Sequence, residues 1–120
     1  MNKHNMLIKN SEKTFLITLH GFFGIEEAEK FFVDYTNHTS KINCNDYSIV
    51  IVCRELAVFK PEILPYLKEA YKLYKNFKTI IFINPPKITP KSQIRRIASE
   101  ENLQAHFVNT DTEAYAICKK

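Results

Sequence analysis

The chain has 120 residues, of which 45% are hydrophobic and 25% are charged, and its formal net charge is +4 at neutral pH. That length suits one ordinary hydrophobic core, so we expect residues 1–120 to form a single domain. The positive charge is mild. A nucleic-acid partner is therefore not favoured, because domains that depend on phosphate contacts concentrate far more basic charge on one face.

The sequence carries no signal for a membrane or for secretion. No apolar run approaches the roughly 18 residues of a membrane-spanning helix, and the start MNKHNMLIKN lacks the apolar core and cleavage site of a signal peptide. We therefore predict no membrane insertion and a cytoplasmic location. Cys44, Cys53 and Cys118 form no Cys-x-x-Cys pair, so neither a disulfide framework nor a zinc module is expected.

The first predicted elements are two strands in a hairpin. Residues 4–23, HNMLIKNSEKTFLITLHGFF, contain two extended apolar runs separated by turn-forming residues. Phe22 and Phe23 stand between two glycines at the exit from the second strand. An aromatic pair at a strand end normally packs beneath the following helix, so we expect both rings in the core. An exposed interaction patch is the alternative.

The middle of the chain alternates between helix and strand patterns. Residues 25–35 have apolar side chains at three- and four-residue steps, which predicts an amphipathic helix with acidic residues in its first turn. The run SIVIVC, residues 48–53, is typical of a parallel strand that is buried on both faces. A second helix follows and begins near Leu64, because Pro61 and Pro65 disturb its start. Another buried strand, KTIIFIN, comes next.

The remaining pattern completes an α/β fold. Thr89 is expected to cap a third helix with Pro90 in its first position, AHFV to form a short strand, and TDTE at residues 110–113 to begin a last helix as a capping box. The resulting order predicts a mostly parallel sheet of about five strands, sandwiched by about four helices. The crossovers are right-handed and the N-terminal edge strand is antiparallel.

Motifs for catalysis and cofactor binding are missing from the sequence. With two glycines in the chain, neither a Gly-x-Gly-x-x-Gly turn nor a phosphate loop can be written. The four histidines are scattered without a ligand-like spacing, so we expect no metal and no cofactor. Glu55 and Glu62 flank the turn after the central strand. They have no neighbouring base or recognisable pocket, and we do not expect the chain to be an enzyme.

The stretch SIVIVCRELAVFKPEILPYLKEAYKLYKNFKTIIFINPP, residues 48–86, has a length and apolar rhythm that resemble part of the STAS domain, the fold of bacterial anti-anti-sigma factors. The matching part is the central strand, turn, helix and next strand of that domain. DTEAYAI, residues 111–117, is similar to the last STAS helix, and the resemblance covers residues 6–117. It implies a STAS-like fold and a protein partner, such as a kinase-like anti-sigma regulator.

In the STAS family the turn after the central strand usually reads Asp-Ser-Ser-Gly, and a partner kinase phosphorylates its second serine. Residues 60–63, KPEI, occupy these positions here, so the phospho-acceptor is absent. Glu62 either mimics part of the charge of a phosphoserine or is simply a favourable residue for a first helical turn.

We therefore predict a non-enzymatic regulatory or scaffold module that is not switched by serine phosphorylation at the usual position. It would bind its partner through the turn of residues 55–62 and the following helix, with Phe59 as the apolar anchor. The predicted contact residues are Glu55, Val58, Phe59, Lys60, Glu62 and Lys68.

Three alternatives stay open at this point. The resemblance extends to STAS/SEC14-like proteins, which implies a small-molecule or lipid ligand in an apolar pocket. Catalysis by Glu55 and Glu62 is a further alternative that no motif supports. The N-terminal hairpin also leaves one edge of the sheet open, which allows a homodimer.

Overall fold

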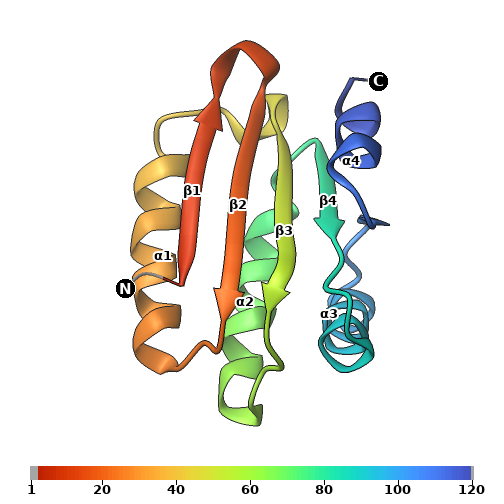
Figure 1. The fold of residues 1–120 in the computed structure, drawn as a ribbon. Coiled ribbons are helices and arrows are strands. Elements are labelled where there is room, and N and C mark those ends of the chain that lie inside the picture. The colour runs from red at the N-terminus through yellow and green to blue at the C-terminus, as the bar shows by residue number, and fades with distance from the viewer. Residues whose placement is uncertain (1–2, 120) are drawn as a thin grey trace.

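The computed structural model describes residues 3–119, which form one five-stranded sheet and four α-helices (Figure 1). The strands lie side by side in the order of the sequence. They are β1 (His4–Lys9), β2 (Thr14–Gly21), β3 (Ser48–Leu56), β4 (Thr79–Ile83) and β5 (His106–Val108). β1 is antiparallel to β2, and the other neighbouring strands are parallel. The predicted fold class, with its antiparallel N-terminal edge strand, is confirmed.

Three helices cover one face of the sheet. α1 (Ile25–Thr39), α2 (Leu64–Tyr74) and α3 (Ile88–Glu100) each connect two neighbouring parallel strands. Because the strands advance in one direction and such crossovers are right-handed, the three helices fall on the same face. Their buried side chains form one cluster with residues of β2, β3 and β4. α4 (Asp111–Cys118) lies on the opposite face, where Ala114 packs with Val50 and Ile81.

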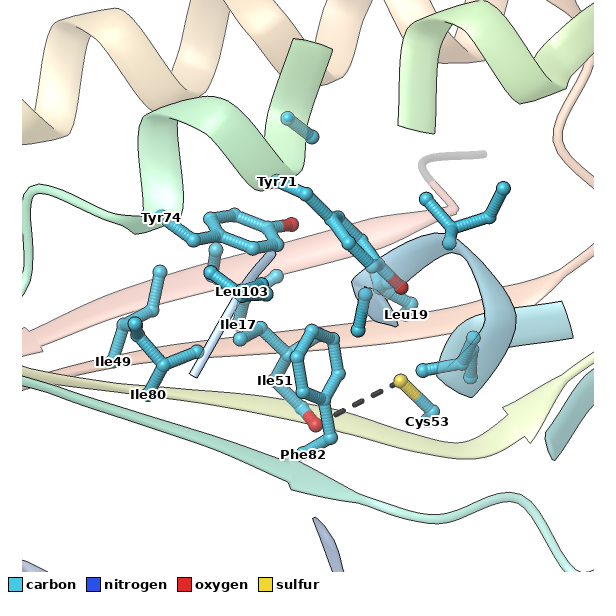
Figure 2. Packing of buried hydrophobic residues seen from close by; sticks show 14 of the residues in the cluster. Ile17, Leu19, Ile49, Ile51, Cys53, Tyr71, Tyr74, Ile80, Phe82 and Leu103 are labelled. Carbon is cyan, nitrogen blue, oxygen red and sulfur yellow. Dashed lines mark hydrogen bonds between the residues drawn. The ribbon is translucent and has the colours of Figure 1, made fainter. Parts of the chain in front are cut away.

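The centre of the main core is aromatic. Figure 2 shows Tyr71 and Tyr74 directed from α2 towards the sheet, where Phe82 and Ile51 lie. The ring centroids of Tyr71 and Phe82 are 5.3 Å apart in a tilted arrangement, a geometry that adds to the gain from buried area. Beside them the Cys53 thiol donates to the carbonyl oxygen of Ile51 across 3.7 Å. This packing anchors α2, and with it the turn that precedes α2, over the middle of the sheet.

The helix starts agree with the sequence prediction in three cases out of four, and the first of them is α1, which begins at Ile25. α2 begins at Leu64 after a short 3₁₀ turn, and the Thr110 hydroxyl caps α4 by accepting from the Glu113 N–H at 3.2 Å. The predicted cap of α3 is wrong, because α3 begins at Ile88 and no side chain caps it. Pro90 is then the third helical residue. Its missing N–H costs nothing there either, since the first four N–H groups of a helix have no intrahelical partner.

No helix within residues 3–119 has both the length and the apolar character needed to cross a membrane.

Candidate functional site

Three loops meet at the carboxyl ends of the parallel strands, which is where ligand sites of open α/β sheets usually lie. They follow β2, β3 and β4, at the lower end of the sheet in Figure 1. Together they line an open groove of about 410 Å³. Phe22 comes from the first loop, Ala57 and Val58 from the second, and residues 85–87 from the third. The groove is thus assembled from segments that are far apart in the sequence.

Large apolar side chains are exposed at this end of the molecule. On the groove itself, Phe22 is 57% exposed and Val58 is 37% exposed. Ile25 and Ile88 are also exposed, at the starts of α1 and α3. Within residues 3–119 these are four of the six large hydrophobic side chains that are exposed. Exposed apolar residues that gather at one place mark interaction surfaces more often than isolated ones do.

Charged side chains frame the apolar part of the groove. Arg54, Glu55 and Lys87 line it, and all three are exposed. The guanidinium of Arg54 donates to Asp111 Oδ1 at 2.8 Å, which links the end of β3 to α4. This hydrogen bond raises the pKa of Arg54. The ion pair is screened by solvent and contributes little to stability, but it directs the guanidinium of Arg54 towards α4.

Gln93 of α3 holds the turn after β3. Its Oε1 accepts from the Phe59 N–H and its Nε2 donates to the Phe59 carbonyl oxygen, both at 2.9 Å. One side-chain amide thereby satisfies both backbone groups of a turn residue, much as a neighbouring strand would. Sequence analysis missed Gln93, because a contact between residues 34 positions apart leaves no local pattern.

The predicted anchor, Phe59, does not face solvent. It is 6% exposed, and its side chain belongs to the main core, where it borders a small apolar cavity between α1 and α2. The prediction of an exposed Phe59 is therefore wrong. The ring lines this cavity together with Ile63 and Leu67, while Gln93 holds the Phe59 backbone.

The aromatic pair after β2 also differs from the prediction. Phe23 is buried at 8% exposure, as expected, whereas Phe22 is 57% exposed. The pair lies in the short loop between β2 and α1, where the ring of Phe23 enters the core and the ring of Phe22 lines the groove.

The other predicted contact residues lie in three different parts of the structure. Glu55 and Val58 line the groove. Lys60 and Glu62 are exposed on the same turn, outside the groove lining, and Glu62 lies in the 3₁₀ turn before α2. Lys68 is half-buried on α2, with its Nζ 3.6 Å from Glu100 Oε1 of α3. The structure therefore brings Glu55 and Val58 together with Phe22, and it places Lys68 against α3.

The three thiols are not activated. Burial raises the pKa of Cys53, of Cys44 and of Cys118, so each stays protonated at neutral pH. Within residues 3–119, no three His, Cys, Asp or Glu side chains are grouped so that they can hold a metal ion.

The chain matches no protein-family model and no curated protein sequence. Its function is therefore inferred from the geometry of the groove.

Proposed function

We propose that this chain is a non-enzymatic regulatory or scaffold module that binds a protein partner in the groove at the carboxyl ends of β2, β3 and β4. The observation that carries the proposal is the exposure of Phe22 and Val58 on two of the loops that line the groove. Protein interfaces depend on a few apolar anchors, aromatic ones above all, that are surrounded by polar residues. Phe22 takes the anchoring role that the sequence had indicated for Phe59.

The rigidity of the groove supports this proposal. Gln93 holds the turn that carries Val58, while Pro85, Pro86 and Pro90 form the wall opposite that turn. Proline has a fixed φ angle, so little backbone freedom remains to be lost in this wall when a partner binds. A surface that is already ordered before binding pays a smaller entropic cost when the complex forms.

The resemblance to STAS domains contributes the proposed class of partner. Its support is the agreement of element order and sheet topology with what the resemblance implies. The partner class that it favours is a kinase-like regulator. The resemblance assigns the position of the phospho-acceptor to Glu62, which is exposed, so binding would not be switched by serine phosphorylation at that position.

The test compares two groove variants, Phe22→Ser and Val58→Lys, with Val33→Lys as a matched control. Val33 is 60% exposed on α1 and does not line the groove. Affinity purification from lysate of the source cells selects a candidate partner, which is then purified and titrated against all four proteins. We expect each groove variant to raise the Kd at least about tenfold, the effect of losing about 1.4 kcal/mol. The control should leave the Kd unchanged. Equal Kd values for all four proteins would contradict the proposal.

A small-molecule ligand is the second candidate, and the size of the groove favours it. A volume of about 410 Å³ falls within the range of about 300–1,000 Å³ that is usual for small-molecule sites. The apolar cavity beside Phe59 holds only about 40 Å³, too little for an acyl chain. Native mass spectrometry separates the two candidates. A bound small molecule adds a defined mass to the protein, and this added mass should be absent from Val58→Trp, because the larger side chain fills the groove.

A further inference from the structure

The two edges of the sheet differ in how they are protected from pairing. β5 has three residues, and a short edge strand is itself a protection. β1 has six residues, and they pair with β2 in one unbroken register without a bulge. Its sequence, HNMLIK, contains no proline. The short length that protects β5 is therefore missing from β1, and the one lysine of β1, Lys9, stands at its last position.

One hydrogen bond fixes which backbone groups of β1 face its free edge. The His20 N–H donates to the Lys3 carbonyl oxygen at 2.9 Å. Alternate residues of an antiparallel strand bond to the same neighbour, so Asn5, Leu7 and Lys9 direct their backbone groups towards β2. Met6 and Ile8 direct their N–H and C=O groups away from the sheet. These two residues are uncharged, and their side chains are half-buried against the main core.

Among residues 3–119, two large exposed hydrophobic residues are remote from the groove, and both belong to the elements at this edge. Leu7 is 52% exposed on the α4 side of β1, and Val33 is 60% exposed on α1. α1 packs behind β1, where Asp34 Oδ2 lies 2.6 Å from His4 Nε2 (Figure 1). Apolar side chains thus accompany unpaired backbone groups at the edge.

We propose that a second copy of this chain pairs with the free edge of β1, antiparallel, about a two-fold axis at Leu7. A strand paired with its own copy in this way presents the same groups on both sides of the axis. Met6 then lies opposite the partner's Ile8, and Ile8 opposite the partner's Met6. Each such pair exchanges two backbone hydrogen bonds, so all outward groups of Met6 and Ile8 are satisfied.

The side chains favour this register. Leu7 lies directly opposite the partner's Leu7 in a non-hydrogen-bonded pair, where the Cα atoms are about 4.5 Å apart and the side chains touch. Lys9 lies opposite the partner's Asn5, so no like charges meet. A register centred on Met6 instead would place Lys9 opposite the partner's Lys3, and like charges directly opposite each other are destabilising.

The first test is the mass in solution, measured by light scattering behind size exclusion at high micromolar concentration. We expect twice the monomer mass of 14.1 kDa for the wild type. Leu7→Lys should return the mass to that of the monomer, because two like charges then face each other at the axis. The control Ile88→Lys changes an aliphatic residue at the groove end that is even more exposed than Leu7, and this variant should remain a dimer. A monomeric wild type, or a dimeric Leu7→Lys, would overturn the proposal.

The second test fixes the register by disulfide cross-linking, in a background where Cys44 and Cys118 are replaced by Ser. Leu7→Cys should form a covalent dimer on mild oxidation, because the paired Cα atoms lie within the roughly 4.4–6.8 Å that a disulfide spans. In Asn5→Cys and Lys9→Cys the two equivalent positions are four residues out of register, about 13 Å apart, and should not cross-link. Equal cross-linking at the three positions, or none at Leu7→Cys, would overturn the register.

Discussion

The side-chain amide of Gln93 on α3 makes two hydrogen bonds of 2.9 Å to the backbone of Phe59, in the turn after β3. The contact joins two walls of the groove, because Val58 precedes Phe59 in the chain and Pro90 precedes Gln93 by one helical turn. A single polar side chain therefore sets the spacing between the loop after β3 and the start of α3.

The first prediction is that Gln93→Leu lowers the free energy of unfolding by about 1–3 kcal/mol, because it leaves the Phe59 N–H and C=O without partners. Urea denaturation measures the change. Gln93→Glu keeps an acceptor for the N–H but loses the donor to the carbonyl oxygen, so it should also destabilise. Gln104→Leu is the matched control. Gln104 is exposed, and its replacement should change stability by less than about 0.5 kcal/mol. Equal stabilities for Gln93→Leu and the wild type would contradict the role of Gln93.

The second prediction separates the two phenylalanines at the groove end. Phe59→Ala should lower the free energy of unfolding by about 3–5 kcal/mol, since it removes a ring from the core and leaves a cavity. Phe22→Ala should change it by less than about 0.5 kcal/mol, since the ring of Phe22 is exposed. Chemical denaturation of both variants provides the comparison. If Phe22→Ala proved as destabilising as Phe59→Ala, Phe22 would be a core residue and no anchor for a partner.

The fold was predictable because its signals are local. The continuous apolar run of residues 48–53 predicted the buried β3, the prolines near Leu64 predicted the start of α2, and Thr110 predicted the cap of α4. The site was less predictable, because its geometry depends on contacts between distant segments. Gln93 and Phe59 meet only in the folded chain. The sequence had indicated that the ring of Phe59 lies at the surface, but in the fold it is buried.

The same distinction applies to Phe22 and Phe23. The sequence identified the pair as notable, and in the structure one ring is buried and the other is exposed. Which ring enters the core depends on where the chain leaves β2, and the residue types alone do not determine that.

The third prediction concerns thiol reactivity. Burial raises the pKa of Cys53, which is 1% exposed, whereas Cys44 and Cys118 are only partly buried. In the native protein, an aromatic disulfide reagent at neutral pH should therefore modify Cys44 and Cys118 first. Cys53 should react only through unfolding, at a rate that rises with urea concentration. Peptide mapping of a labelling time course assigns each rate. Labelling of Cys53 at the rate of the other two, without urea, would contradict its placement in the core.

The last prediction concerns stability at alkaline pH. Burial raises the pKa of Tyr71 and of Tyr74 well above the ordinary value of 10.0, with smaller contributions from the Cys53 thiol and, for Tyr74, from the neighbouring phenols of Tyr35 and Tyr71. In the unfolded chain these phenols lose their protons near pH 10, while the folded chain keeps them. Below pH 10 the folded state therefore has its full stability with respect to these groups. Above it, each group lowers the free energy of unfolding by up to about 1.4 kcal/mol per pH unit.

Urea denaturation between pH 7 and pH 11 measures this decline. Tyr71→Phe removes one of the titrating phenols, so the decline above pH 10 should be shallower in this variant by the contribution of one group. Phe77→Leu is the control. Phe77 is buried in the same core but carries no titrating group, so its replacement should lower stability at every pH and leave the steepness unchanged. If Tyr71→Phe declined as steeply as the wild type, the alkaline loss would have to come from other groups, of which Tyr74, Tyr35 and Cys53 are the buried candidates.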